Sequence, residues 1–411
     1  MINLYIFNEL SRGAIYGIGT YIRELTFALK DSNINVCVVH LRSEKQNEKP
    51  IESDLVHHYY IPSPINWNTS IDWNKQNDLY YRNVVYLLKL RVKDSERLVF
   101  HLNFNLSSQL AEELKRAFDC KIVTTIHYFD WSFLLFGNIL HFRQILSSPN
   151  IEHDDVLNKS IIKLFSIEKK IFKTVDRIIC LSENTENILQ DDYQIKPEKI
   201  TVIYNGLTNT HADSDRALLI QKYYFSDIPI ILFVGRLDDI KGLKYAIRAF
   251  KTVLKSYQNC QFIIAGEGLF AIHMKECEDI WSHITWTGLI SQEKLFNLYS
   301  IADIGLMPSF HEQCSFVAIE MMMHGVPLIA STSTGLKEMV EDGITGFHIP
   351  VIEYPNKMEI DSSLLAEKIL YLLQHPEERK YMKNNARKRY ERVYSFDVFR
   401  ENMLGFYNSL F

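Results

Sequence analysis

Residues 310–320 read Phe-His-Glu-Gln-Cys-Ser-Phe-Val-Ala-Ile-Glu, and this stretch holds two carboxylates, Glu312 and Glu320, eight residues apart. An apolar run at 302–307 precedes it and predicts a strand that ends at Pro308. On one continuous helix the two acids would share a face, because eight residues make about two turns; if the first turn is still loop, Glu312 precedes the helix. Both arrangements bring an acid and unpaired backbone N–H groups to the carboxyl edge of a sheet, where α/β proteins bind ligands. Taken alone, the pattern also fits an amphipathic surface helix with two solvated acids.

Further motifs accompany the paired acids along the chain. In order they are Val-Ile-Tyr-Asn-Gly at 202–206, Val-Gly-Arg-Leu at 234–237 followed by Lys-Gly at 241–242, Trp-Thr-Gly-Leu-Ile at 286–290, and Gly-Val-Pro at 325–327. Together with the acids they resemble the retaining GT-B glycosyltransferases of the large family 4 type, over nearly the whole chain, most densely from about residue 176 to 350 and least between 42 and 165. The resemblance implies an α/β fold of the GT-B class, in which two Rossmann-like domains place their parallel sheets across a deep interdomain cleft.

The composition is that of a soluble globular protein. The chain has 411 residues, of which 47% are hydrophobic and 23% charged, and this length predicts two or three domains. Its net charge of −5 argues against a nucleic-acid-binding protein, which needs a basic surface to neutralise phosphates. The six cysteines are scattered without CxxC or CxxH spacing, as is typical of proteins in a reducing compartment.

The sequence predicts neither a signal peptide nor a membrane span. The N-terminus, Met-Ile-Asn-Leu-Tyr-Ile-Phe, has no basic region before its apolar run and reads as a first strand. The longest apolar stretch, residues 131–142, is shorter than the roughly 18 residues that span a bilayer. We therefore expect a cytoplasmic protein, with peripheral docking on the inner face of a membrane left open and the oligomeric state undetermined.

Short apolar runs alternate with helical patterns almost throughout, which predicts parallel sheets covered by helices. Residues 1–208 are expected to form an N-terminal, acceptor-side domain, and residues 227–394 a C-terminal domain that binds the nucleotide sugar. The linker is expected at 209–226, where strand character is lost. Apolar residues then recur at helical spacing over 395–411, and the resemblance implies that this last helix belongs to the first domain.

The diphosphate of a nucleotide sugar needs fixed cations and backbone N–H donors. Arg236 follows an expected strand and Lys241 begins the next helix, and the resemblance assigns both to the phosphates. Basic residues on loops after strands are also common without such a role. A second group of donors is implied where a helix opens after the first acid, and its backbone amides belong to Cys314, Ser315 and Phe316. The family usually has Gly-Phe-Gly at this point, so the chain lacks those flexible glycines.

The resemblance also assigns residues to the donor sugar and the base. The family typically has Gly-Gly near the phosphates where this chain has Tyr16 and Gly17, so Gly17 or Gly19 is expected there, with a tight turn as the alternative. His127 ends an expected strand and resembles a histidine that reaches the donor sugar, with a structural role as the alternative. Gly288 and Leu289 lie in the stretch that resembles the base-binding strand and loop.

The two acids receive separate roles from the resemblance. Glu320 is similar to the glutamate that binds the ribose, and one carboxylate can accept hydrogen bonds from both ribose hydroxyls. Glu312 is similar to the acid that contacts donor-sugar hydroxyls beside the anomeric carbon. Transfer is implied to proceed with retention of configuration by front-face attack, with the leaving phosphate taking the acceptor's proton. The DxD tripeptide at Asp213 and Asp215 falls in the linker rather than at a strand end, so we expect no metal and no cofactor.

The implied activity is hexosyl transfer from a UDP- or GDP-linked donor to a glycan, lipid-linked or peptide acceptor. Sugars stack on aromatic rings, and the segments expected on the acceptor side are rich in them, although core packing under long loops is the alternative. These aromatic residues are Tyr59, Tyr60, Trp67, Trp73, Trp131, Phe133 and Phe136.

Two other classes of function remain open at the level of sequence. A dinucleotide-dependent oxidoreductase would use Gly17 and Gly19 after the first strand, but it needs an acid about 20 residues further on, where this chain has Val-His-Leu-Arg at 39–42. Arg42 would instead suit the extra phosphate of NADP. A non-catalytic binding module is the other alternative, which the paired acids and the two cations make less attractive.

Overall fold

The computed structural model describes residues 1–9, 17–43, 56–63, 73–92, 96–104, 108–147, 155–211 and 216–411. Trp67, Asp213 and Asp215 lie outside these residues. The chain divides into two compact units. The first unit comprises Met1–Trp131, Ser148–Gly206 and Phe396–Phe411, and the second comprises Ser132–Ser147 and Leu207–Ser395.

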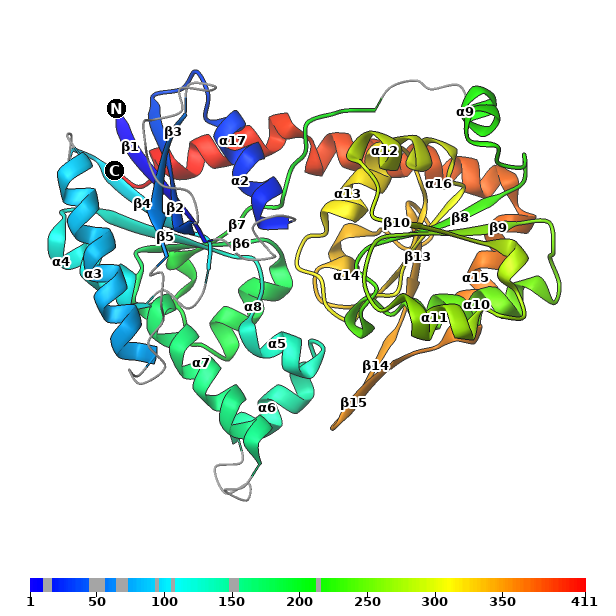
Figure 1. Ribbon diagram of the computed structural model, residues 1–411, viewed down its shortest axis with the longest axis horizontal. Coiled ribbons are helices and arrows are strands. Elements are labelled where there is room, and N and C mark those ends of the chain that lie inside the picture. The colour runs from blue at the N-terminus through cyan, green and yellow to red at the C-terminus, as the bar shows by residue number, and fades with distance from the viewer. Residues whose placement is uncertain are drawn as a thin grey trace. The chain divides into compact units, whose positions relative to one another are not determined.

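A parallel sheet forms the centre of the first unit (Figure 1). Its strands are β1 (Ile2–Glu9), β2 (Ile34–Ser43), β3 (His57–Pro62), β4 (Leu98–Leu102), β5 (Lys121–Ile126), β6 (Arg177–Cys180) and β7 (Ile200–Val202). They pair in the order β3-β2-β1-β4-β5-β6-β7, each parallel to its neighbour. The strands are nearly continuous apolar runs, as in β1, where Leu4, Ile6 and Phe7 are fully buried, because a parallel sheet is covered on both faces.

Helices connect these strands. They are α2 (Gly17–Ala28), α3 (Trp73–Arg91), α4 (Ser108–Ala117), α7 (Val156–Thr174), α8 (Glu183–Asp191) and the short 3-10 turn η1 (Pro197–Lys199). The last helix, α17 (Phe396–Asn408), packs on α2. There the rings of Phe396 and Phe27 lie 4.8 Å apart, and those of Phe399 and Tyr21 lie 5.9 Å apart. The apolar face of α17 therefore completes the core of the first unit.

The second unit has its own parallel sheet, with the order β10-β9-β8-β11-β12-β13. Its strands are β8 (Ile230–Val234), β9 (Gln261–Ala265), β10 (Ile284–Gly288), β11 (Ile304–Met307), β12 (Leu328–Ser331) and β13 (Gly346–Ile349). Its helices include α9 (Arg216–Tyr223), η2 (Asp239–Lys241), α10 (Leu243–Leu254), α11 (Phe270–Glu276), η3 (Trp281–His283), α12 (Gln292–Ile301), α13 (Phe316–Met323), α14 (Leu336–Met339), α15 (Ser362–Gln374), α16 (Pro376–Arg389) and the π turn η4 (Tyr390–Tyr394).

A segment from the first half of the chain also belongs to the second unit. It contains the end of α5 (Asp130–Leu135) and all of α6 (Ile139–Ser147). The side-chain amide of Asn138 donates to the carbonyl of Tyr354 at 2.7 Å, in the hairpin of β14 (Val351–Tyr354) and β15 (Lys357–Ile360). The hydroxyl of Ser132 lies 3.0 Å from Nε2 of His311, so this segment reaches the loop that follows β11.

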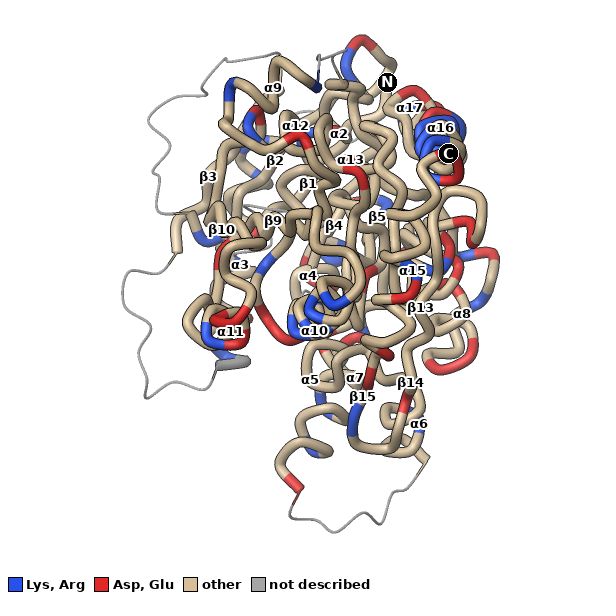
Figure 2. The backbone as a smooth tube through the Cα atoms, turned by 90° about the vertical axis from the view of Figure 1, so that its right-hand side faces the viewer, with Lys and Arg blue, Asp and Glu red and all other residues tan. Residues whose placement is uncertain are grey.

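The basic end of α16 fixes the helix that carries the second acid. Figure 2 shows Lys and Arg gathered along α16, and its last turn holds Arg387 and Arg389. Arg387 donates to the carbonyl of Met323 at 2.5 Å, and Arg389 to that of Met339 at 2.6 Å. These carbonyls end α13 and α14, where backbone acceptors lack helical partners and cations are favoured.

Both sheets reverse their direction of growth at one strand pair. The chain winds outward from β1 to β3 and then continues from β4 on the other side, and in the same way it winds from β8 to β10 and continues from β11. Ligands of open α/β sheets bind beyond the carboxyl ends of strands at such switch points. The predicted α/β architecture with two Rossmann-like sheets is therefore confirmed. None of the helices in the described ranges is long and apolar enough to cross a membrane.

Candidate functional site

The loops after β8 and β11 lie side by side at the switch point of the second sheet. Gly242 makes this approach possible, because a Cβ at its position would lie 1.9 Å from the carbonyl oxygen of Pro308. Its φ of 68° also lies in the left-handed region that glycine adopts readily. The backbone N–H of Phe310 then donates to the carbonyl of Ile240 at 2.8 Å. The Lys-Gly motif thus joins the loop that carries Lys241 to the loop that carries the first acid.

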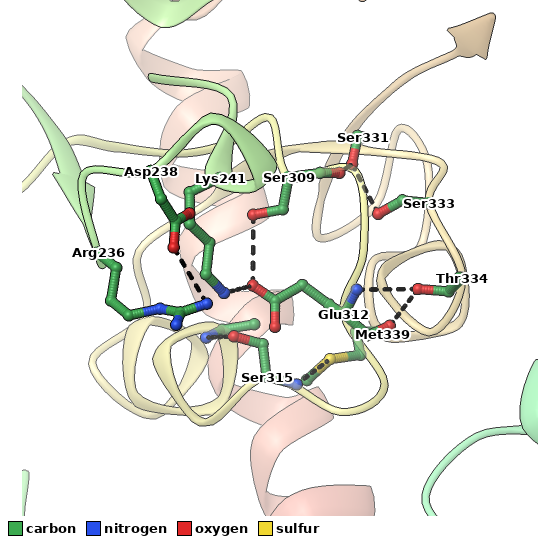
Figure 3. A network of polar contacts seen from close by, with 11 residues as sticks. Arg236, Asp238, Lys241, Ser309, Glu312, Ser315, Ser331, Ser333, Thr334 and Met339 are labelled. Carbon is green, nitrogen blue, oxygen red and sulfur yellow. Dashed lines mark hydrogen bonds and ion pairs between the residues drawn. The ribbon is translucent and has the colours of Figure 1, made fainter. Parts of the chain in front are cut away.

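Lys241 and Glu312 form an ion pair across this junction (Figure 3). Their side chains are only 20% and 12% exposed, so the pair is screened less by water than a surface pair would be. Ser309, just before the acid, donates its hydroxyl to the same carboxylate at 3.3 Å. The motifs identified at 241–242 and 310–320 therefore meet at one point, although they are far apart in the sequence.

Arg236 lies on the first loop after β8 and is more open to solvent. Its guanidinium pairs with Asp238 at 3.1 Å, and the two side chains are 46% and 38% exposed (Figure 3). A pair with this exposure contributes little to stability. Both cations that the sequence assigns to phosphate therefore already have a carboxylate partner, which an incoming diphosphate would have to replace.

The helix after the first acid begins later than a continuous helix would. Ser315 is the N-cap of α13, and its hydroxyl accepts from the backbone N–H of Ala318 at 3.5 Å. Glu312 therefore precedes the helix, as the second of the two arrangements expected from the sequence. The backbone N–H of Ser315 points to the sulfur of Met339 at 3.3 Å, and Cys314 is buried, whereas Phe316 is partly exposed. Of the three predicted amides, that of Ser315 is thus already directed at a weak acceptor.

The backbone of Glu312 is held by the loop after β12. The N–H of Gly335 donates to the carbonyl of Glu312 at 2.7 Å. A Cβ on Gly335 would lie 1.6 Å from the carbonyl oxygen of Gln313, so glycine is required for this contact. Neither contact follows from the sequence alone, since Ser-Thr-Ser-Thr-Gly at 331–335 has the composition of an ordinary loop.

Glu320, the second acid, lies within α13 and is only 9% exposed. The phenol of Tyr299, from α12, donates to its carboxylate at 2.8 Å. Burial raises the pKa of Tyr299 well above its usual value, so the phenol remains a donor at every physiological pH. The backbone N–H of His324 donates to the carbonyl of Glu320 at 3.1 Å. The predicted ribose-binding acid is therefore a buried, oriented side chain rather than a solvated one.

The predicted base-binding residues end the edge strand of the same sheet. Gly288 has a φ of 65°, and a Cβ there would meet open space. Its carbonyl accepts from the N–H of Gly266 at 3.0 Å, which ties the end of β10 to the end of β9. Leu289, the next residue, is 64% exposed.

The remaining predicted site residues belong to the first unit. His127 follows β5, is half-buried, and its Nε2 lies 3.0 Å from the side-chain oxygen of Asn103 at the end of β4. Gly17 is the first residue of α2 and Gly19 lies in its first turn. A Cβ on Gly17 would meet open space, so its immediate surroundings do not require glycine. Arg42, the residue that would suit NADP, pairs with Glu9 at 2.5 Å.

Three of the aromatic residues considered for the acceptor differ in burial. Trp131 is fully buried and its indole N–H donates to the phenol of Tyr193 at 3.1 Å, so this residue belongs to the core. Phe133 and Phe136 are 44% and 38% exposed, and Phe133 lies beside the ring of His311. Burial lowers the pKa of His311 to about 4, so this neighbour of the first acid is neutral. Within the described ranges, no group of His, Cys, Asp and Glu side chains is arranged to hold a metal ion.

Two family models match the chain, one in each half. Glycosyltransferase Family 4 matches residues 15–209, and Glycosyl transferases group 1 matches residues 216–389. The chain belongs to the family 4, group 1 glycosyltransferases. The second match spans both loops of the Lys241–Glu312 pair and all of α13, so the resemblance inferred from the motifs is confirmed.

Curated relatives of this glycosyltransferase are distant. Alpha-D-kanosaminyltransferase of Streptomyces kanamyceticus is 26% identical over 250 residues, which are 59% of this chain and 63% of the relative. The capsular polysaccharide biosynthesis glycosyltransferase CapM of Staphylococcus aureus is 26% identical over 256 residues, 60% of this chain and 65% of the relative. The chain thus spans about three fifths of the length of these relatives.

Solved structures show the same fold over the whole chain. Sucrose-phosphate synthase from Thermosynechococcus elongatus matches with a TM-score of 0.77 at 20% identity, over 100% of this chain and 99% of that one. HepE of Anabaena in complex with UDP-glucose matches with a TM-score of 0.70 at 16% identity, over 100% of both chains. The glycosyltransferase therefore has the GT-B fold.

Proposed function

We propose that this protein transfers a sugar from a UDP- or GDP-linked donor to a hydroxyl group of a glycan, lipid-linked or peptide acceptor. The observation that carries the proposal is the meeting of Lys241 and Glu312 at the switch point of the second sheet. A cation and an acid at this place match the two opposite demands of a nucleotide sugar, whose phosphates are anionic and whose sugar offers hydroxyl protons. A lipid-linked acceptor would bring the protein to a membrane surface.

The donor is proposed to lie along the carboxyl edge of the second sheet. Lys241 and Arg236 would bind the diphosphate once it displaces their carboxylate partners, and the leaving nucleotide's charge would remain neutralised as it develops. Glu320, oriented by Tyr299, would accept from the ribose hydroxyls. Glu312 would then accept from a hydroxyl of the sugar. Gly288, with open space at its Cβ, is proposed to lie against the base.

The reaction is proposed to retain the anomeric configuration without a metal. Two fixed cations supply the charge neutralisation that a divalent ion supplies elsewhere, which supports metal independence. Front-face attack is favoured over double displacement because Glu312 accepts a hydrogen bond from Ser309 and is proposed to accept another from a sugar hydroxyl, and both contacts lower its strength as a nucleophile. The leaving phosphate would take the proton of the acceptor hydroxyl.

The test is a panel of UDP- and GDP-sugars incubated with the full chain, scored by release of free nucleotide with and without EDTA. We expect slow hydrolysis of one donor, unchanged by EDTA, and lost in Lys241→Ala. With an acceptor supplied, NMR of the product should show the anomeric configuration of the donor. No release from any donor would overturn the proposed activity, and loss on chelation that Mn²⁺ restores would overturn metal independence alone.

A further inference from the structure

The side chain of Asn103 fixes which nitrogen of the His127 ring carries the proton. Asn103 directly follows β4, is 1% exposed, and donates its amide N–H₂ to the backbone carbonyl of Phe7 at 3.2 Å. A backbone carbonyl can only accept, so this contact sets the orientation of the amide and leaves its oxygen facing His127. The distance from that oxygen to Nε2 of His127 is 3.0 Å. Because the amide oxygen can only accept, Nε2 must be the protonated nitrogen.

The surroundings of the ring keep it neutral. Burial lowers the pKa of His127 to about 3, so at neutral pH the ring has one proton, and that proton is on Nε2. Among the described residues, the titratable side chains that face it are Tyr21 from α2, whose ring lies edge-on 4.8 Å away, and His101 from β4. Burial raises the pKa of Tyr21 and lowers that of His101 to about 3, so both are uncharged as well.

These neighbours are themselves held in place. His101 lies between the hydroxyl of Thr125, 2.7 Å from its Nε2, and the phenol of Tyr407 on α17, 2.6 Å from its Nδ1. The phenol of Tyr21 lies 3.0 Å from the same threonine hydroxyl. This buried network fixes the ring of Tyr21, which in turn limits rotation of the His127 ring. Packing against Tyr21 thus fixes the orientation of the His127 ring, and Asn103 fixes its tautomer.

We propose that Asn103 is a positioning residue that holds His127 as its Nε2–H tautomer, so that Nδ1 presents a hydrogen-bond acceptor to a hydroxyl group of the sugar substrate. The inference rests on the proposed function for the identity of that ligand, although the tautomer itself does not. A neutral acceptor of this kind can bind a hydroxyl proton but cannot act as a cation or as a general acid. Because burial lowers its pKa to about 3, His127 is also too weak a base to take the acceptor's proton, and its role is to recognise the sugar.

The tautomer can be measured directly in the full chain labelled with ¹⁵N-histidine. Loss of one set of signals in His127→Gln assigns the ring. We expect the two ¹⁵N shifts of an Nε2–H tautomer, unchanged between pH 8 and pH 5. An Nδ1–H tautomer, or titration near pH 6.5, would overturn the proposal, and this result does not depend on any transferase activity.

Two variants of Asn103 test the positioning role. Asn103→Leu removes the acceptor and should mix the two tautomers and lower kcat about tenfold, the usual effect of losing one hydrogen bond, with an unchanged nucleotide Kd. Asn103→Asp keeps an acceptor but adds a charge, so His127 should titrate at higher pH and activity should fall as the medium is acidified. Thr124→Val, which removes a buried hydrogen bond to the carbonyl of Leu102 on the same strand pair, controls for loss of stability. A single unchanged tautomer with full kcat in Asn103→Leu would overturn the assignment.

Should Asn103→Leu fail to fold, the wild-type spectrum and Asn103→Asp still decide the question. Failure of the proposed function would look different. In that case no donor would be turned over by the wild-type protein, while the Nε2–H signals would remain. The ¹⁵N spectrum of the wild-type protein therefore tests the tautomer, and donor turnover tests the proposed transferase function separately.

Discussion

The hydroxyl of Thr334 fixes the peptide backbone of Glu312 from both sides. The N–H of Glu312 donates to that hydroxyl at 2.9 Å, and the hydroxyl donates in turn to the carbonyl of the same residue (Figure 3). Thr334 has a φ of 30°, which a β-branched residue rarely adopts. The loop after β12 therefore holds an unfavourable backbone conformation at the place where it supports the acid, as positions near active sites often do.

Removing this hydroxyl should lower turnover more than it lowers nucleotide binding. In Thr334→Val both hydrogen bonds are lost, each typically contributing about 0.5–1.5 kcal/mol, so we expect kcat to fall about 10- to 100-fold. The Kd for free UDP or GDP should change less than about threefold, since Glu312 is assigned to the sugar. Thr334→Ser keeps the hydroxyl and should restore most of kcat.

The matched control for this substitution is Thr332→Val, two residues earlier. Its hydroxyl accepts from the N–H of Val351, in β14, at 3.1 Å, so kcat should stay near the wild-type value. Equal losses of kcat in Thr334→Val and Thr332→Val would show that the loop affects kcat through the stability of the protein and not through Glu312.

Breaking the Lys241–Glu312 pair from either side should have opposite effects on nucleotide binding. Lys241→Ala removes a phosphate partner and should weaken UDP or GDP binding by roughly 1.5–3 kcal/mol, about 10- to 100-fold. Glu312→Gln removes the carboxylate that competes for the lysine, so calorimetry should show equal or tighter binding together with a large loss of transfer. The control is Lys251→Ala, which breaks the ion pair between Asp279 and Lys251 in the last turn of α10; it should alter neither nucleotide binding nor transfer. Weaker nucleotide binding in Glu312→Gln would contradict the competition between acid and phosphate.

The buried pair of Tyr299 and Glu320 should affect binding of every nucleotide, with or without a sugar. Glu320→Gln presents an N–H₂ group where ribose hydroxyl protons would point, and we expect free UDP or GDP to bind about 10- to 100-fold more weakly. Tyr299→Phe keeps the acid but removes the phenol that orients it at 2.8 Å, so its effect should be smaller, up to about tenfold. Isothermal titration on the two variants checks the ranking. A larger loss in Tyr299→Phe than in Glu320→Gln would mean that the phenol itself contacts the ligand.

Gly242 should not tolerate alanine because the added Cβ would clash with a neighbouring loop. Comparison with Gly343, which has a similar φ but open space, separates this clash from the cost of the backbone conformation. Gly242→Ala would place Cβ 1.9 Å from the carbonyl oxygen of Pro308, in addition to the cost of a left-handed conformation. Gly343 has a similar φ of 73° with nothing near its Cβ, so Gly343→Ala measures that conformational cost alone, about 1–3 kcal/mol. We expect a clearly lower Tm in Gly242→Ala than in Gly343→Ala, and weaker nucleotide binding only in the former. Equal Tm values would mean that the two loops can separate without cost.

Acid should destabilise the protein through its buried neutral histidines. Burial lowers the pKa of His101 to about 3 in the folded chain, against about 6.5 when unfolded, so the unfolded state binds more protons between these values. Each such histidine therefore removes about 1.4 kcal/mol of the free energy of unfolding per pH unit as pH falls below about 6.5. Urea midpoints at pH 7 and pH 5 should differ less in His101→Gln than in the wild type. Parallel changes in both proteins would exclude His101 as a contributor.

The fold was predictable because its signals are local. The apolar run at 229–235 is long enough for one buried strand and becomes β8 (Ile230–Val234), and the run at 302–307 becomes β11 (Ile304–Met307). The start of α13 was left undecided, because the sequence between Glu312 and Ser315 allows either loop or helix. Hydrogen bonds to the loop after β12 decide it, and those contacts come from a distant part of the chain.

The residue types of the site were also predictable, but their partners were not. Lys241 and Glu312 belong to recognisable motifs, yet their ion pair depends on the neighbouring positions of β8 and β11 in the sheet. Thr334 and Tyr299 carry no motif and act only through the acids they contact. Asn103 offered a weaker signal that was missed: an amide directly after a buried strand is a polar group that must find partners.

The packing of α17 on the first unit has a consequence for how the protein is made. The first unit cannot complete its core until Phe399 and Tyr407 emerge from the ribosome, after every strand of the second unit has been synthesised. Until then, the apolar face of α2 around Tyr21 and the imidazole of His101 lack their final neighbours. The second unit, whose residues are all made earlier, can fold first even though it comes later in the chain. Any truncation within α17 should therefore damage the start of the protein, and a nascent chain stalled before residue 396 should need a chaperone to keep its first half soluble.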